Sequence, residues 1–412
     1  MSTLPSDVIM DILSRLPVKT LLRFKSASKP WRDLIDCPYF IKAHLKRSMD
    51  RGDYNLSLSP KYFETVPDNA VPIKAQQHSR TGALGSCNGL LCLLDGGEED
   101  NIALWNPSTR KLQTLPFTPI QPPRGLTVAT LVSYGFGYDS VNDDYKLVRM
   151  AQFTYSSGLY GSFESQVDVY SLKMNSWRRI QDFPYYLPVE QVHGELACGA
   201  LHWIVLQRPR WNINIIVSLV AAFDLGLEEY REVPLPQFLG EGCFVMSLGV
   251  LGGCLCLLCH YGDHVDMWVM KEYGLKESWT ILSIVLDPQV ICPIRYLQPL
   301  TYSKNGDQIL FVGNNSKIIW YDFEKKKFTD FQICGNIPKY FEVDICLESL
   351  VPINGDVTSD GKKQQSSEKK MRKKRSIVML EFMGRSSKLG RKRSERIKRR
   401  RGEIHNVLSY FY

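Results

Sequence analysis

The chain has 412 residues, and its 51 Lys and Arg residues outnumber its 43 Asp and Glu residues by eight. The excess is unevenly spread, because residues 361–402 alone hold 18 basic and 3 acidic residues. The remainder is mildly acidic, which argues against a nucleic-acid-binding fold across the whole chain. A hydrophobic fraction of 44% allows a sizeable core and excludes disorder for most of the chain.

The N-terminal sequence and the cysteines bear on the compartment. Residues 1–16 have no basic leading segment and charges interrupt their apolar stretch, so we expect no signal peptide. The uncharged stretch 242–262 is long enough to span a bilayer. Gly252-Gly253 near its middle favours two strands around a turn, so we expect no membrane partner. The 11 cysteines then indicate reduced thiols, and we expect a nuclear or cytoplasmic protein, or both.

The first fifty residues predict a small helical unit. Apolar residues at helical spacing form a stripe from Val8 to Leu16, and Pro17 ends this helix. Further helical runs follow over 20–28, around Trp31 and after Pro38. So short a unit barely forms a core of its own, and its surplus of large apolar side chains predicts a partner surface. Packing against the chain's own main domain is the alternative.

Residues 3–45 resemble the F-box motif from end to end. The matching positions are Leu4-Pro5, Ile12-Leu13, Arg15-Leu16-Pro17, Leu21, Ser28-Lys29, Trp31, Leu34-Ile35 and Phe40-Ile41. The resemblance implies docking onto a Skp-type adaptor, which links to a cullin-RING ubiquitin ligase. It places nine residues at the adaptor interface: Leu4, Pro5, Ile9, Ile12, Leu13, Leu16, Pro17, Leu21 and Leu22. Trp31 is expected to stabilise the helical core instead, and Pro30 is a departure from the motif that leaves one helix boundary open.

Turn signals recur through the body of the chain at a nearly constant spacing of 53 to 55 residues. They are Asn88-Gly89, Asp143-Asp144, Cys198-Gly199, Gly252-Gly253 and Asn305-Gly306. Apolar runs flank most of them, so each predicts a β-hairpin. A strand, a polar turn and a shorter strand follow each hairpin. Four strands in roughly 50 residues are typical of a propeller blade, closest to the kelch period.

Five full units cover roughly residues 80–333. The stretches 54–58, 71–75 and 342–350 remain at the two ends, where together they can form one more blade. Such a blade would join the ends of the ring and cover free sheet edges, so we expect six blades.

The same stretches resemble the plant F-box-associated, kelch-like domain. The matching segments are Gly85-Ser-Cys-Asn-Gly-Leu-Leu-Cys, Trp105-Asn-Pro-Ser-Thr-Arg, Tyr134-Gly-Phe-Gly-Tyr-Asp, Asp144-Tyr-Lys-Leu-Val-Arg, Val169-Tyr-Ser-Leu, Leu201-His-Trp and Lys276-Glu-Ser-Trp-Thr. With the F-box, the resemblance covers about residues 3–350. It implies capture of a target protein for ubiquitination, and the identity of that target is not a property of the family.

Motifs that suggest chemistry have simpler structural explanations. Cys254 and Cys256 would share one face of a strand, as zinc ligands can, but no second Cys/His pair has finger spacing and buried core cysteines are favoured. Asn106-Pro-Ser-Thr-Arg110 could sit at a binding rim, yet Pro107 favours a turn. The tryptophans of the repeats are expected to pack between sheets. No familiar catalytic signature occurs, so we expect a non-catalytic protein without cofactor or metal; a kelch-type enzyme is the alternative.

The basic tail predicts disorder, because dense like charges repel one another. Its clusters form a candidate nuclear-import signal made of Lys369, Lys370, Arg372, Lys373, Lys374, Arg375, Arg391, Lys392, Arg393, Lys398, Arg399, Arg400 and Arg401. Contact with nucleic acid or with an anionic membrane, or no dedicated role, are the alternatives. Aromatic residues are sparse among the basic ones, so base stacking is not supported.

The sequence therefore predicts an α+β multidomain chain. A helical F-box over 1–48 precedes an all-β, kelch-like propeller over 50–353 and a disordered basic tail over 354–412. The expected function is substrate recognition in an SCF ubiquitin ligase, with a Skp-type adaptor, a cullin-RING ligase and an unidentified target protein as partners. The alternative is a nucleic-acid-binding or non-ligase scaffold protein that acts through the tail.

Overall fold

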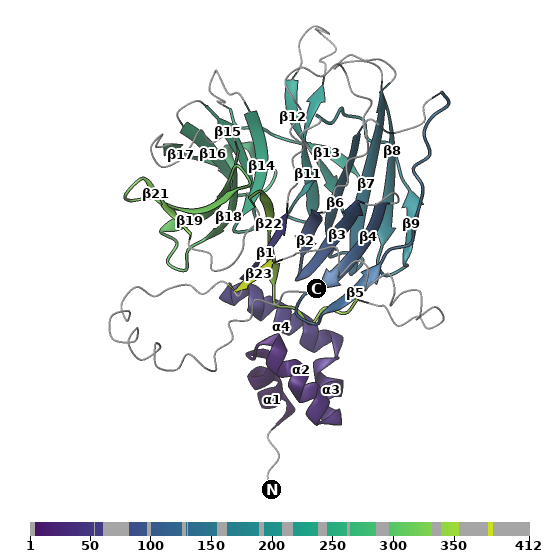
Figure 1. Ribbon diagram of the computed structural model, residues 1–412, viewed down its shortest axis with the longest axis vertical. Coiled ribbons are helices and arrows are strands. Elements are labelled where there is room, and N and C mark those ends of the chain that lie inside the picture. Colours follow the sequence, from purple (N-terminus) through teal and green to yellow (C-terminus); the bar gives the residue numbers. More distant parts are fainter. Residues whose placement is uncertain are drawn as a thin grey trace.

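The computed structural model divides into a helical unit and a ring of β-sheets (Figure 1). It describes residues 5–353, apart from 53, 61–81, 97–99, 126–128, 130, 155–162, 189–192, 208–216, 238–244, 262–263, 286–295 and 332–338, together with residues 378–381. Figure 1 shows the helices gathered at one end of the molecule, with α4 lying between the other helices and the sheets.

Four helices make up the helical unit: α1 (Ser6–Ser14), α2 (Val18–Ala27), α3 (Lys29–Ile35) and α4 (Pro38–Arg51). Prolines mark their starts, because Pro5 and Pro17 precede α1 and α2 while Pro30 and Pro38 stand in the first turns of α3 and α4. A proline in the first turn costs no helical hydrogen bond. Pro30 therefore begins a helix rather than breaking one, which fixes the boundary that the sequence left open.

The body contains five four-stranded antiparallel sheets, as the repeats predicted. Their strands are β2 (Gly82–Cys87), β3 (Leu90–Gly96), β4 (Asp100–Asn106) and β5 (Lys111–Thr114); β6 (Leu131–Asp139), β7 (Asp144–Thr154), β8 (Phe163–Ser171) and β9 (Ser176–Arg179); β10 (Glu195–Ala197), β11 (Ala200–Gln207), β12 (Val217–Asp224) and β13 (Tyr230–Val233); β14 (Val245–Leu251), β15 (Cys254–His260), β16 (His264–Met270) and β17 (Trp279–Val285), with η1 (Lys276–Ser278) before β17; and β18 (Leu297–Tyr302), β19 (Gln308–Gly313), β20 (Lys317–Asp322) and β21 (Lys327–Asp330). Each repeat is thus one blade of a five-bladed propeller, and each predicted turn joins its first two strands.

A sixth, smaller sheet differs from the expected sixth blade. It has three strands in the order β22 (Phe341–Leu347), β1 (Tyr54–Pro60) and β23 (Val378–Glu381). The pairing of β1 with β22 joins the two ends of the ring, as expected. The stretch 71–75, which was expected to contribute a strand, lies outside the described residues.

The strand β23 also corrects the prediction of disorder for the whole tail. It lies inside the basic segment, yet residues 55–58 of β1 pair with it in antiparallel register. The segment Ile377-Val-Met-Leu-Glu-Phe-Met383 is a short apolar run between basic clusters. Composition averaged over the tail hides such a run, and its high β-propensity accounts for the strand.

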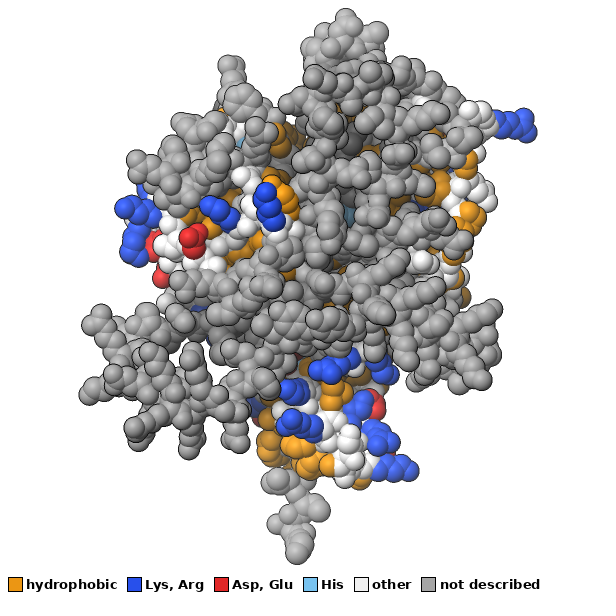
Figure 2. Space-filling model, viewed as in Figure 1, with side chains coloured by type: hydrophobic (Ala, Val, Ile, Leu, Met, Phe, Trp, Pro, Cys, Tyr) orange, Lys and Arg blue, Asp and Glu red, His pale blue; other side chains and the backbone are white. Residues whose placement is uncertain are grey.

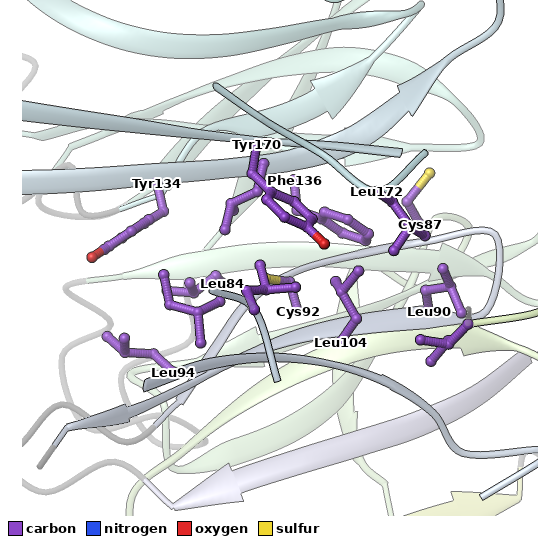
Figure 3. Packing of buried hydrophobic residues seen from close by; sticks show 14 of the residues in the cluster. Leu84, Cys87, Leu90, Cys92, Leu94, Leu104, Tyr134, Phe136, Tyr170 and Leu172 are labelled. Carbon is purple, nitrogen blue, oxygen red and sulfur yellow. The ribbon is translucent and has the colours of Figure 1, made fainter. Parts of the chain in front are cut away.

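Large side chains fill the space between neighbouring blades. Figure 3 shows the first such layer, where Leu84 and Leu104 of the first blade face Tyr134, Phe136 and Tyr170 of the second. All five side chains are almost fully buried. Burial of this kind is the main stabilising term in the ring.

The tryptophans only partly follow the prediction that they are core residues. Trp203 is fully buried between the second and third blades, and Trp279 is nearly so. Trp105, Trp177 and Trp320 are only partly buried. Trp177 instead donates its indole N–H to Pro116 and lies under the guanidinium of Arg149.

The segment after β22 joins the helical unit to the propeller. This strap (residues 348–353) places Leu350 in the core of the helical unit, beside Leu13, Leu21 and Phe40. Its next apolar residues, Val351 and Ile353, instead belong to the core of the first blade. The two units therefore share one short stretch of chain between their hydrophobic cores.

One buried side chain holds the strap in place. Asn106, at the end of β4, donates its amide hydrogens to the carbonyls of Ser349 at 3.1 Å and Val351 at 2.9 Å. Its own oxygen accepts the backbone N–H of Thr109, which confirms the turn predicted for this segment. All polar atoms of the Asn106 side chain are thus used inside the protein.

The first hairpin turn supports the strap from the other side. Gly89 has a φ of +79°, and a Cβ added there would lie 2.3 Å from the Cβ of Ser349 and 2.5 Å from the carbonyl of Leu347. Only glycine combines this backbone conformation with so close an approach. The Asn88-Gly89 turn was predicted, but its role as a seat for a segment 260 residues away was not.

We predict that Asn106→Ala destabilises the folded chain by about 2–4 kcal/mol, because the carbonyls of Ser349 and Val351 lose their donors while they stay buried. Urea unfolding measures the loss. Asn101→Ala, at an exposed position of the same strand, is the control and should be nearly neutral. Equal stability of the two variants would show that the strap is not held by Asn106.

Candidate functional site

The helical unit presents an apolar surface on α1. Val8 and Ile12 are 42% and 48% exposed, and their spacing of four residues puts them on one face of the helix. Figure 2 shows hydrophobic side chains gathered on the part of the helical unit that points away from the sheets, with Lys and Arg beside them. Exposed apolar side chains on so small a unit mark a surface that a partner can cover.

The structure divides eight of the nine predicted adaptor residues into three groups. Pro5, Ile12 and Pro17 are exposed. Ile9, Leu16 and Leu22 are half-buried and pack against the helical core while keeping part of their surface accessible. Leu13 and Leu21 are buried within that core, so in this arrangement they support the surface from below. Leu4 lies outside the described residues.

The sequence prediction omitted Val8. Val8 belongs to the helical stripe noted in the sequence, but the F-box resemblance did not single it out. Its spacing relative to Ile12 is the signal that could have found it. Trp31, expected in the core, is 36% exposed and packs its ring against Phe24, with ring centres 4.9 Å apart. It therefore contributes to both the core and the surface.

Charged groups fix α1 against α4. Arg47 donates from Nη1 to the carbonyl of Asp11 at 3.0 Å and to Oγ of Ser14 at 2.6 Å, and it also pairs with the Asp11 carboxylate. Arg51 donates to the carbonyl of Arg15 at 2.8 Å. These cations lie at the C-terminal end of α1, where the helix dipole favours positive charge. The hydrogen bond from Arg47 holds the pKa of Asp11 below its usual value.

The helical unit also contacts the propeller through charged groups. The carboxylate of Glu348 in the strap accepts the backbone N–H of Val18 at 3.1 Å, at the start of α2. Nζ of Lys42 on α4 lies 2.8 Å from Asp143, in the turn between β6 and β7. Together with the shared Leu350, these contacts give the exposed apolar face of α1 a fixed orientation relative to the ring.

The face of the ring that the helices leave open follows from the strand order. The turns between first and second strands, such as those at Gly89 and Asp143, lie toward the helical unit. Because the strands are antiparallel, the loops between second and third strands and the connections between blades lie on the opposite face. Many residues of those loops are outside the described part of the chain. Loops on a rigid scaffold are the usual place for target recognition.

Acidic side chains lie on strands near the axis of the ring. Glu195 is on β10, and Glu342 and Asp344 are on β22, two innermost strands of their sheets. Burial raises the pKa of Glu195 to about 7. Burial, with the negative charges of Glu342 and Glu195, raises the pKa of Asp344 to about 7. The one sign of this in the sequence is the alternation of Glu342, Val343 and Asp344 within an otherwise apolar strand.

The described residues offer no group of three or more His, Cys, Asp or Glu side chains that could hold a metal ion. Cys254 and Cys256 lie on one face of β15, as expected, in the core between the fourth and fifth blades. Cys259 belongs to the core on the other face. Within the described part of the chain, no helix is long and apolar enough to cross a membrane. The thirteen nuclear-import candidates all lie outside the described residues.

Two family models match the chain. The model described as "F-box domain" matches residues 1–42, and the model described as "F-box associated beta propeller domain" matches residues 47–353. The F-box protein CPR1 of Arabidopsis thaliana is 39% identical over 376 residues, which cover 85% of this chain and 89% of that protein. Another F-box protein of the same plant is 33% identical over 413 residues, covering 94% of this chain and all of the relative.

We predict that Asp344→Asn stabilises the protein more at pH 7.5 than at pH 4.5. The folded-state pKa of Asp344 is raised, so its stability contribution is intact below the unfolded pKa of about 4 and is lost as pH rises toward 7. The loss is at most about 1.4 kcal/mol per pH unit in that window. Asparagine resembles the protonated acid in shape and does not ionise, so the variant does not undergo this loss of stability.

Thermal unfolding at the two pH values measures this effect. Asp330→Asn, at an exposed position of β21, is the matched control. An Asp344→Asn gain in Tm that is the same at both pH values would contradict the assignment of a raised pKa to Asp344.

Proposed function

The chain belongs to the F-box proteins that carry an F-box associated β-propeller domain, and we propose that it is the substrate-recognition subunit of an SCF ubiquitin ligase. In this role it recruits a target protein for ubiquitination and degradation. The observation that carries the proposal is the exposed apolar face of α1, formed by Val8 and Ile12 on a unit with F-box sequence.

The partner of this face is a Skp-type adaptor, which connects the chain to a cullin-RING ligase. Pro5, Ile12 and Pro17 are the exposed contact residues of this face. The half-buried residues Ile9, Leu16 and Leu22 add the part of their side chains that stays accessible. Apolar anchors surrounded by charged residues are typical of specific protein interfaces. Arg15, Arg47 and Arg51 lie around the end of α1 and supply such charges.

The mechanism is proximity rather than chemistry by this chain. A target held on the loop face of the propeller is brought close to a ubiquitin-conjugating enzyme, which raises the effective concentration of its lysines. The strap and the contacts of Glu348 and Lys42 keep the adaptor and the target in a fixed relation. A stiff connection of this kind limits the positions from which target lysines are reached.

The basic clusters of the tail support a second, separate proposal about location. Two runs of Lys and Arg, 369–375 and 391–401, suit recognition by the import machinery. We therefore propose that the protein acts in the nucleus, the cytoplasm or both. Deletion of residues 385–412 tests this proposal while it leaves β23 in the chain, and an unchanged distribution of the protein would contradict a dominant role for the second run.

We predict that Ile12→Asp weakens adaptor binding about tenfold to thirtyfold, because a charge replaces an anchor at the centre of the apolar face. Ile12 is nearly half exposed, so the change leaves the helical core intact, whereas half-buried Leu16 would mix folding with binding. Calorimetry with purified adaptor measures the affinity.

Val141→Asp is the matched control, since Val141 is an exposed apolar residue on the propeller. It should bind the adaptor like the natural chain. Undiminished binding by Ile12→Asp would overturn the assigned interface. Adaptor binding without recovery of a cullin from cells would favour the non-ligase scaffold, and loss of all activity on deleting residues 385–412 would favour a nucleic-acid role.

A further inference from the structure

The strand β1 has two edges, and they are used unequally. On one edge all seven residues of β1 pair with β22. On the other edge only residues 55–58 pair, and their partner is β23 from the C-terminal tail. The five other sheets each have four strands, so this sheet is the smallest of the ring.

An open edge on β1 would be a hazard. An edge strand presents unpaired backbone N–H and C=O groups, which readily pair with another extended chain. One face of β1 is apolar, because Leu56 and Leu58 are buried against the fifth blade. The strand is thus held rigidly along one edge and one face, as a template for strand addition has to be.

The tail has the sequence that such an edge accepts. Residues 377–380 are Ile-Val-Met-Leu, rich in side chains that favour strands and without proline or glycine. The 24 residues between Ile353 and Val378 can span up to roughly 80 Å, far enough to reach β1. The matched propeller family model ends at residue 353, so β23 lies beyond the family's domain.

We propose that the outer edge of β1 is a strand-addition site for an extended apolar peptide, and that the chain's own segment Val378–Glu381 occupies it. The tail is then a clasp on the sheet where the two ends of the propeller meet. This inference does not depend on the role of the chain in ubiquitination.

The clasp is expected to be exchangeable. It pairs over four residues against seven for β22, and each backbone hydrogen bond makes only a modest net contribution to stability. In the sequence, Arg375 and Arg385 stand three and four residues from its ends.

Hydrogen exchange on the full chain tests the clasp in place. We expect the double variant Met379→Pro, Leu380→Pro to accelerate exchange at least tenfold for those amides of residues 55–58 that point toward β23, while the alternate amides, which point toward β22, stay protected. Successive amides of a strand point to opposite edges, so one of the two prolines must remove a bond to β1. The matched control is Arg385→Pro, Ser386→Pro, just outside the strand, and it should exchange like the natural chain. Equal exchange in all three proteins would overturn the proposal.

A peptide tests the site itself. A chain that ends at residue 360 should bind a synthetic peptide of residues 374–385 and regain slow exchange at residues 55–58. The same peptide with Met379→Pro and Leu380→Pro should do neither. Failure of the natural peptide to bind would overturn the strand-addition site. If the full chain were a dimer whose protection at residues 55–58 falls on dilution, the strand would come from a second copy and the clasp within one chain would be refuted.

Discussion

The buried amide of Asn106 is the interaction on which the arrangement of the molecule depends. It joins the end of β4 to the strap, and the strap carries Leu350 into the helical core and Val351 into the first blade. An amide is suited to this task because it satisfies two carbonyls that would otherwise be buried without donors. No apolar side chain of similar size could fix the strap in one register.

Because it shares the strap with the propeller, the helical unit is a fixed part of the molecule rather than an independent appendage. An F-box attached by a loose linker would let the bound target sample many positions. Here the helices depend on a leucine supplied from beyond the last blade-joining strand, and Gly89 seats the same segment from the propeller. The exposed apolar face of α1 and the far face of the propeller therefore behave as opposite ends of one rigid body. Their separation is set by the propeller and not by a flexible spacer.

The sequence predicted local structure well where a local cause exists. The turn at Asn88-Gly89 has positive φ angles, which are typical of Asn and Gly, and the spacing of such turns predicted the five four-stranded sheets. The joining of the two chain ends also followed, because unused strands remained there. Contacts between distant segments could not be predicted, since nothing near Asn106 signals its partners at 349 and 351. The strand β23 was not predicted from the sequence. The prediction for the tail rested on its charge, and four consecutive apolar residues change the average composition of so basic a segment very little. Leu13 and Leu21 are buried whereas Ile12 is exposed, although all three fit the same sequence motif.

The pairing of β1 with β22 has a consequence for synthesis on the ribosome. The helical unit emerges first, but Leu350, which completes its core, is made about 300 residues later. Until then β1 has no partner and the first blade lacks its strap. A nascent chain that has not reached the strap therefore lacks Leu350, one of the buried residues of the helical core. Only a chain translated as far as the strap can complete the hydrophobic cores of both the helical unit and the propeller.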